Sequence, residues 1–176
     1  MSQHYDIVKD CLRGERKAQR ELYNLYSRAM YNTCLRMLGT VENAEDVLQN
    51  AFIDVYTNLE NFRFESSVGT WIKRIVVNNC INFMNKKRPN FTELTDNIPD
   101  MYSDVNYSND QHESKWSVEH IKNAVQSLPE GYRVVFSLYA FEGYDHEEIA
   151  DILKISESTS KSQYSRAKSK IRNLLN

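Results

Sequence analysis

Hydrophobic residues in the first half of the chain recur at the spacing of amphipathic α-helices in three segments. The first segment, residues 16–38, carries Ala18, Leu22, Leu25, Ala29 and Met37 on one face. The second follows Gly39-Thr40, is expected to be capped by Asn43, and carries Ala44, Val47, Leu48, Ala51, Phe52, Val55 and Leu59. The third, about 70–87, is expected to bury Ile72, Ile75, Val76, Cys80 and Phe83.

The second half of the chain predicts four more helices after a polar gap. The stretch "NFRFESSVGT" (61–70) lacks periodicity and indicates a loop, and residues 89–115 are polar with scattered tyrosines. Helices are expected over 116–128, 132–142, 145–153 and 157–175, with a break at Pro129-Glu130-Gly131. The pattern predicts an all-α protein of two small helical domains, 1–89 and 116–176, joined by a flexible acidic linker, 90–115.

Composition and charge sharpen this division. With 5 glycines and 3 prolines among 176 residues, the chain favours long helices. Residues 89–115 hold 1 basic and 6 acidic residues, whereas residues 1–88 hold 13 basic and 10 acidic ones. The three cysteines show no CxxC spacing, which argues against a zinc site and a disulfide framework. Without a signal segment or a long apolar run, we expect a cytoplasmic protein that does not insert into a membrane.

The last two helices have helix-turn-helix spacing. Ile149, Ala150 and Leu153 would form the inner face of the first helix, and Ser156 would cap the second. Inward positions of the second helix are expected at Ser160, Tyr164, Ala167, Ile171 and Leu174. The outward positions are Lys161, Ser162, Ser165, Arg166, Lys168 and Ser169. Cations that contact phosphates, beside short polar side chains that approach base edges, are typical of a helix that enters the DNA major groove.

Two further surfaces lie in the first domain. Arg74, Asn78, Asn82 and Asn85 share one face of the third helix, where amides suit base edges and cations suit phosphates. Phe62, Phe64 and Trp71 lie nearby and suit stacking on unpaired bases, although each is equally compatible with the core. Glu45, Asp46, Gln49 and Asn50 form a polar patch that suits a basic protein surface or is simply a solvated face.

Three motifs in this order resemble the extracytoplasmic-function (group 4) subfamily of bacterial sigma-70-type sigma factors. "NAEDVLQNAFIDVY" is similar to the family's polymerase-binding segment, and "FRFESSVGTWIKRIVVNNCINFMNKKRP" to its −10 recognition and melting segment. "LPEGYRVVFSLYAFEGYDHEEIADILKISESTSKSQYSRAKSKIRNLL" is similar to its −35-reading domain. The resemblance implies a sigma factor that binds core RNA polymerase through the β′ clamp helices and the β subunit. It implies promoter DNA and an anti-sigma factor as further partners, and no cofactor, metal or catalytic residue.

The resemblance also assigns residues by position. The polymerase-binding set is Ala44, Glu45, Asp46, Gln49 and Phe52. The −10 set is Ser66, Ser67, Thr70, Trp71, Lys73, Arg74, Asn78, Asn79, Asn82, Lys86, Lys87 and Arg88. The −35 set is Ser158, Thr159, Lys161, Ser162, Gln163, Ser165, Arg166 and Lys168.

Three residues depart from the family pattern. Lys154 stands where glycine is usual, so a left-handed, strained backbone is expected there. Ser160 replaces an apolar residue, which would weaken inward packing, and Gln163 replaces arginine, which removes one DNA contact.

Two other function classes remain as alternatives. An autonomous helix-turn-helix regulator would normally need a dimer interface, and no heptad helix is present. An enzyme acting on nucleic acid would need a motif such as HExxH or GxxxxGK, and His4, His112, His120 and His146 are scattered. His146 is expected to begin a helix rather than to bind a metal.

Overall fold

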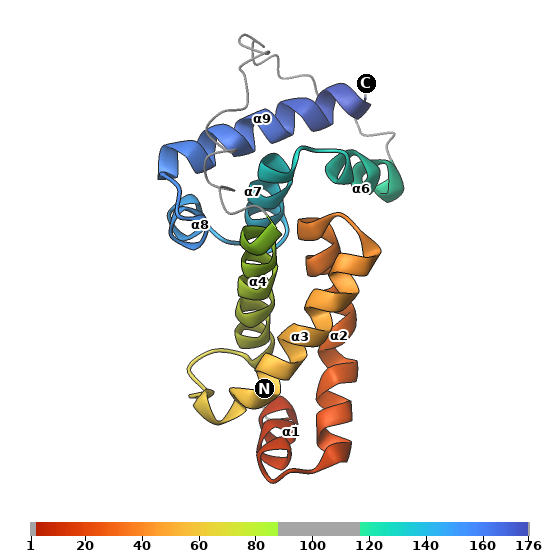
Figure 1. Ribbon diagram of the computed structural model, residues 1–176, viewed down its shortest axis with the longest axis vertical. Helices are drawn as coiled ribbons and strands as arrows, with labels where there is room; N and C mark the ends of the chain where they lie inside the picture. Colours follow the sequence, from red (N-terminus) through yellow and green to blue (C-terminus); the bar gives the residue numbers. More distant parts are fainter. Residues whose placement is uncertain (1–2, 88–116, 176) are drawn as a thin grey trace. The chain divides into compact units, whose positions relative to one another are not determined.

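The computed structural model describes residues 3–87 and 117–175, and all regular secondary structure in these ranges is helical (Figure 1). Contacts divide the chain into two compact units, Met1–Pro89 and Asn90–Asn176. The all-α prediction is therefore confirmed. The expected linker, 90–115, and Arg88 of the −10 set lie outside the described residues. None of the described helices has the length and apolar character needed to cross a membrane.

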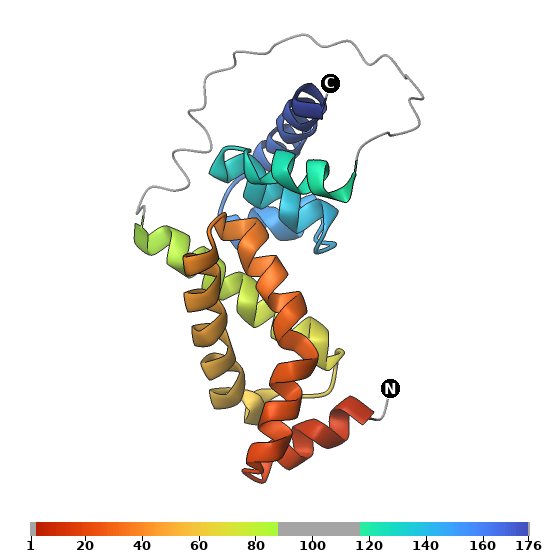
Figure 2. The same cartoon turned by 90° about the vertical axis from the view of Figure 1, so that its right-hand side faces the viewer.

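The first unit is a bundle of three long helices with a shorter helix packed at one end. Its elements are α1 (Gln3–Leu12), α2 (Arg16–Leu38), α3 (Val41–Thr57), the 3-10 helix η1 (Leu59–Asn61) and α4 (Val68–Lys87). Figures 1 and 2 both show α2, α3 and α4 side by side, with α1 against the first half of α2. Leu22, Met37, Val55 and Ile72 are fully buried between these helices, so each helix buries one apolar stripe and leaves its other face to solvent.

The buried stripe of α2 differs from the prediction. Leu25 is 47% exposed and Ala29 is also exposed, whereas Met30, Thr33 and Cys34 are buried. The helix packs against α1, α3 and α4, and its buried positions shift around the helix axis from Ala18 and Leu22 to Cys34 and Leu38. A single stripe of constant phase was therefore the wrong model for this helix.

Two helix starts in the first unit also differ from the prediction. Thr40, rather than Asn43, caps α3, because its Oγ1 accepts a hydrogen bond from the Asn43 N–H at 3.4 Å. Ser67 caps α4 in the same way, accepting from the Thr70 N–H at 3.1 Å, so α4 begins two residues earlier than expected. The core of α4 also extends to residues that the sequence analysis did not place there: Val68, Val77, Ile81 and Met84 are buried, and Ile75 and Phe83 are half-buried.

The second unit contains α6 (Val118–Gln126), α7 (Glu130–Ala140), α8 (His146–Leu153) and α9 (Glu157–Leu175). Leu138 and Ile149 are fully buried. Leu128 and Tyr132 form a core cluster with Ala167 of α9. The expected break at 129–131 is shorter than predicted. Pro129, which has no N–H and a φ of −52°, takes the N-cap position, so Glu130 and Gly131 already belong to α7. Leu174 is 50% exposed, so the prediction that it packs inward is wrong.

The turn between α8 and α9 contains the strained residue that the sequence predicts. Lys154 has φ 58° and ψ 41°, in the left-handed region, and its N–H donates to the Ala150 carbonyl to end α8. Ser156 caps α9, accepting from the Thr159 N–H at 3.0 Å. The left-handed conformation is costly for a residue with a Cβ atom and costs glycine almost nothing.

We therefore expect Lys154→Gly to stabilise the second unit by roughly 0.5–1 kcal/mol. Urea unfolding of the full chain, followed in the transition of the second unit, measures the change. Lys154→Ala removes the same charge while keeping the Cβ atom, so it should leave the midpoint close to that of the wild type. Equal stabilisation by alanine and glycine would contradict backbone strain as the cause.

Candidate nucleic-acid and protein interfaces

The polar face of α3 is presented by a helix that is firmly held on its opposite side. Ala44 and Phe52 are buried, together with Val47, Ala51 and Val55. Glu45, Asp46, Gln49 and Asn50 consequently point to solvent. Ile53, one turn beyond Gln49, is 61% exposed and continues the same face. Ile53 was not predicted as part of this surface, although an apolar residue on an otherwise polar helix face was the available signal. We call Glu45, Asp46, Gln49, Asn50 and Ile53 the α3 face.

A second surface lies on α4 and confirms the predicted exposure of its amides. The exposed residues are Arg74, Asn78, Asn82, Asn85, Lys86 and Lys87, which we call the α4 face. Because α4 has no acidic residue, the charge of this face is positive. Lys87 Nζ donates to the Asn43 Oδ1 at 3.1 Å and lies 4.7 Å from the centre of the Phe83 ring.

Asn79 and Lys73 are less accessible than the other polar residues described in the expected −10 set. Both are half-buried, and the Asn79 amide donates to Asp54 Oδ2 at 2.8 Å and to the Ile75 carbonyl at 3.1 Å. These hydrogen bonds place Asn79 at the junction of α3 and α4 rather than on the α4 face. The observed geometry gives this residue a role in joining two helices.

The loop between η1 and α4 contains three aromatic residues in different environments. Phe62 is buried and lies 5.2 Å, centroid to centroid, from the half-buried ring of Trp71. Phe64 is 40% exposed, and its φ of 60° is left-handed, which is rare for a bulky residue. The sequence left open whether these three rings belong to the core or to the surface. In the structure Phe62 belongs to the core, Phe64 lies at the surface, and Trp71 is half-buried between these extremes.

The hydroxyls of this loop organise its own backbone. Ser67 Oγ lies 2.8 Å from Thr70 Oγ1 and caps α4, while Ser66 is exposed. The loop that carries Phe64 therefore ends in Ser66 and Ser67, next to Thr70 in the first turn of α4.

The outward face of α9 gathers short hydroxyls between cations. Ser158, Ser162 and Ser165 repeat at helical spacing and are exposed, as are Lys161 and Lys168. Thr159 and Arg166 lie half-buried at its edge. We call these seven residues, Ser158, Thr159, Lys161, Ser162, Ser165, Arg166 and Lys168, the α9 face.

Gln163 does not belong to the α9 face. Its side chain is 1% exposed, so the prediction that it faces DNA is wrong. The reason is helical phase, because residues 160, 163 and 167 lie at i, i+3 and i+7 and are all buried against the preceding helices. Gln163, which stands where the family pattern has arginine, therefore affects the packing beneath the α9 face and does not contribute a DNA contact.

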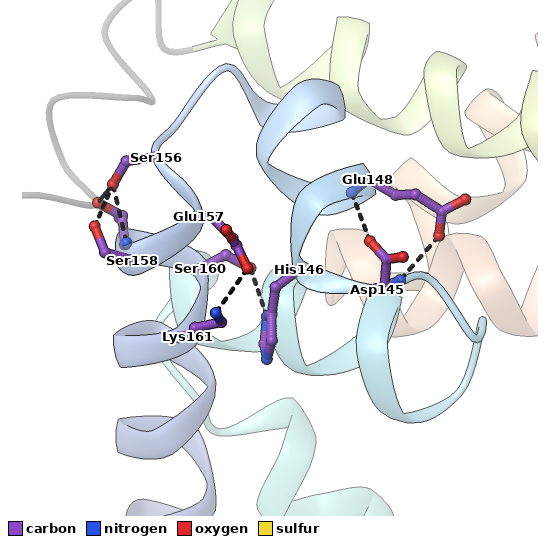
Figure 3. A network of polar contacts seen from close by, with 9 residues as sticks. Asp145, His146, Glu148, Ser156, Glu157, Ser158, Ser160 and Lys161 are labelled. Atoms are coloured by element: carbon purple, nitrogen blue, oxygen red, sulfur yellow. Dashed lines mark hydrogen bonds and ion pairs between the residues drawn. The ribbon is translucent and has the colours of Figure 1, made fainter.

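Ser160 links α8 to α9 with a hydrogen bond in place of an apolar contact (Figure 3). Its side chain is fully buried, and its Oγ lies 2.9 Å from the Nδ1 of His146, the first residue of α8. The His146 ring stacks on Tyr139, with centroids 4.5 Å apart and an interplanar angle of 19°. The expected weakening of inward packing at Ser160 is offset by this bond, which also fixes the His146 ring.

Figure 3 also shows how the ends of the two helices are fixed. Asp145 and Glu148 form a capping box at the start of α8, with each side chain accepting from the other's backbone N–H. Lys161 pairs with Glu157 at 2.6 Å, but both side chains are more than half exposed. Such a pair contributes little stability and can rearrange when a ligand approaches Lys161. In the part of the chain that the structure describes, no cluster of three or more His, Cys, Asp or Glu side chains could hold a metal ion.

Comparison with known proteins assigns both units. The sigma-70 region 2 model matches residues 22–89, and the sigma-70 region 4 model matches residues 119–171. The ECF RNA polymerase sigma factor SigW of Bacillus subtilis is 30% identical over 96% of this chain and 94% of its own length. The chain belongs to the sigma-70 family. It is an extracytoplasmic-function sigma factor, which directs promoter-specific transcription initiation by RNA polymerase.

Other relatives agree. The RNA polymerase sigma-H factor of Pseudomonas aeruginosa is 27% identical over 96% of this chain and 92% of its own length. The sigma factor RpoE from Bartonella quintana, solved in complex with the anti-sigma factor NepR, has the same fold, with a TM-score of 0.57 and 22% identity over 89% of this chain and 95% of its own. CnrH, solved with the cytosolic domain of CnrY, gives a TM-score of 0.54 and 20% identity, covering 96% of this chain and 94% of its own.

Membership of the family excludes the two alternative function classes. Sigma factors are transcription initiation factors rather than enzymes, and they act with RNA polymerase rather than as autonomous regulators. The region 2 match contains the α3 and α4 faces, and the region 4 match contains the α9 face. Helix α1 lies outside both matches.

The environment of His146 makes the second unit sensitive to acid. Burial, and then the charge of Lys161, lower the pKa of His146 below 6.5, against the opposing effects of Glu157 and Asp145. Between the lowered pKa and 6.5 the unfolded chain binds more protons than the folded one. The resulting stability is therefore complete above pH 6.5 and decreases as the pH falls through this window.

We expect an NMR titration of the full chain to give an apparent pKa below 6.5 for His146. Thermal unfolding of the second unit should also occur at a lower temperature at about pH 5.5 than at about pH 7.5. His146→Gln cannot titrate in this range, so its unfolding temperature should depend less on pH. A variant whose pH dependence equals that of the wild type would show that another group causes it.

Proposed function

We propose that the α3 face docks this sigma factor on the β′ clamp helices of core RNA polymerase. The α3 face carries two carboxylates and two amides, and its supporting helix is anchored by fully buried residues on the other side. An acidic patch steers association with a basic partner surface, and the exposed Ile53 adds an apolar residue at one end of the patch. The polymerase and its promoters lie in the cytoplasm, so this is where we place the protein.

The α4 face and the neighbouring loop take the non-template strand of the −10 element. Arg74, Lys86 and Lys87 supply charge for phosphates, while Asn78, Asn82 and Asn85 present amides suited to base edges. Phe64, in the loop that precedes α4, is exposed and offers a surface on which an unpaired base can stack. This strand has to be unstacked from its duplex, which costs a few kcal/mol per step, so capture by these groups helps to keep it open.

The α9 face enters the major groove at the −35 element. Its serines allow the helix to approach base edges closely, and Lys161, Arg166 and Lys168 lie where phosphates or guanines would be contacted. One observation supports the whole proposal. The chain presents three solvent-facing surfaces in this order, one acidic (the α3 face) and two basic (the α4 and α9 faces), and each lies on a helix whose opposite side is buried. An additional β-subunit contact is expected from the family resemblance.

An anti-sigma factor is the remaining proposed partner. Two sigma factors of the same fold, RpoE of Bartonella quintana and CnrH, were solved with an anti-sigma factor and with the cytosolic domain of CnrY, respectively. Exposed apolar residues on the first unit, including Leu25, Val41 and Ile53, are available to such a partner. An inhibitor that covers the α3 face would prevent binding to polymerase.

The docking assignment predicts that Glu45→Lys combined with Asp46→Lys abolishes transcription without unfolding the protein. Both residues are exposed, so reversing their charge should leave the circular dichroism spectrum and the unfolding midpoint unchanged. In vitro transcription of genomic DNA with purified core polymerase should give discrete transcripts with the wild type and none with the variant. Glu21→Lys with Glu60→Lys reverses two exposed charges outside the α3 face and is the matched control for charge. Normal binding of the first variant to core polymerase would refute the assignment.

The −35 assignment predicts that Arg166→Ala weakens binding of the holoenzyme to its −35 element by about 1–3 kcal/mol. Competition between promoter and random duplex measures the change, with the promoter taken from the transcripts described above. Lys122→Ala removes one exposed charge from α6 of the same unit, outside the α9 face, so its effect should be smaller and should not depend on sequence. Unchanged affinity for Arg166→Ala would place the reading face elsewhere on α9.

A further inference from the structure

Helix α1 contacts the loop that presents Phe64, although α1 lies outside the segment that matches sigma-70 region 2. Tyr5 of α1 meets the Phe64 ring edge to face, with centroids 5.1 Å apart and an interplanar angle of 79°. It also lies 6.4 Å from the buried Phe62 ring, which in turn contacts Phe64 at 4.7 Å. Phe62 also contacts Trp71, so the aromatic residues of the loop are linked both to Tyr5 of α1 and to Trp71 of α4.

The backbone at Phe64 needs such support. Its φ of 60° is unfavourable for a residue with a bulky side chain, and a conformation of this kind persists only when surrounding contacts hold it. Phe64 is exposed, so burial does not hold it in place. The Tyr5 and Phe62 rings are the aromatic contacts that the described structure gives to Phe64.

Helix α1 is itself fixed on the bundle and can therefore act as a rigid support. Ile7, Val8 and Cys11 are buried, and the His4 ring forms a hydrogen bond through Nδ1 with the Tyr26 hydroxyl of α2. The Tyr26 ring packs against the first turn of α4, because a Cβ atom added at Gly69 would lie 3.0 Å from Tyr26 Cε1. The same short helix thus contacts the loop directly and α4 through one intervening side chain.

We propose that Tyr5 is a positioning residue for −10 strand capture, holding Phe64 in its left-handed conformation before DNA arrives. This inference rests on the proposed function of the loop and adds to it a residue that touches no DNA. Binding to a preorganised loop avoids the loss of conformational freedom that ordering a mobile loop would require. Tyr5 would therefore affect capture of the unpaired strand and have no effect on docking to polymerase or on −35 binding.

The test uses holoenzyme assembled from core polymerase and the full chain. Fluorescence anisotropy measures its affinity for a labelled single strand with the −10 sequence of a promoter found by in vitro transcription. Tyr5→Leu should weaken this affinity roughly threefold to tenfold, the range expected for losing one edge-to-face aromatic pair. Its affinity for core polymerase should be unchanged. Tyr5→Phe keeps the ring and should bind like the wild type.

A double-mutant cycle with Phe64→Leu separates positioning from general destabilisation. If Tyr5 acts through Phe64, adding Tyr5→Leu to Phe64→Leu should weaken strand binding further by less than about twofold. An equal loss in both backgrounds, or no loss in either, would overturn the proposal. Tyr31→Leu makes the same change at a half-buried position of α2 outside the aromatic contacts and serves as the matched control. Tyr5→Met replaces Tyr5→Leu if circular dichroism shows that the latter does not fold.

A further variant distinguishes failure of this inference from failure of the proposed function. Arg74→Ala combined with Asn78→Ala removes two exposed groups of the α4 face. If that variant binds the single strand as the wild type does, the −10 assignment itself is wrong. If it loses the strand while Tyr5→Leu does not, only the role of Tyr5 is refuted.

Discussion

Each surface to which we assign a function depends on burial of the opposite side of the helix that carries it. On α3, Ala44 and Val55 are fully buried, and on α9 Ser160 and Ala167 are. Burying one valine or leucine side chain contributes about 1.5–3 kcal/mol, whereas an exposed polar residue contributes little. Exposed positions can therefore be occupied by carboxylates, amides or serines without loss of the fold. The chemistry of the three faces follows from this division of each helix.

Directional interactions then fix the angles at which these faces are presented. The hydrogen bond between His146 and Ser160 joins α8 to α9, and the one between Asp54 and Asn79 joins α3 to α4. A net contribution of about 0.5–1.5 kcal/mol per hydrogen bond is small beside the burial of the cores. These bonds matter for the geometry of the fold more than for its stability. Each one specifies a single relative position of two helices, which could slide past each other if apolar contacts alone held them.

The sequence predicted the helices whose apolar periodicity is long and regular, and it predicted the left-handed turn at Lys154 from a missing glycine. It was less successful where packing changes direction along one helix, as at Leu25, and where a polar residue falls on the buried stripe, as at Gln163. Helix α1 was not predicted, although Ile7, Val8 and Cys11 share its buried face at helical spacing, which was the available signal. The placement of Phe64 depends on tertiary contacts with α1, so no local pattern could reveal it.

The bond between Asp54 and Asn79 has a consequence for how the first unit works. The helix that we assign to polymerase docking and the helix that we assign to −10 capture are joined by a 2.8 Å hydrogen bond beside Ile53 of the α3 face. Under this assignment, docking fixes the orientation of α4 as well as that of α3. No covalent chemistry is involved, so strand separation depends on binding free energy that is available only when polymerase, loop and strand are correctly placed. With a rigid junction, docking also positions the DNA-binding helix, so little conformational entropy remains to be lost when the strand binds. With a flexible junction, strand binding would have to order that helix and would be weaker.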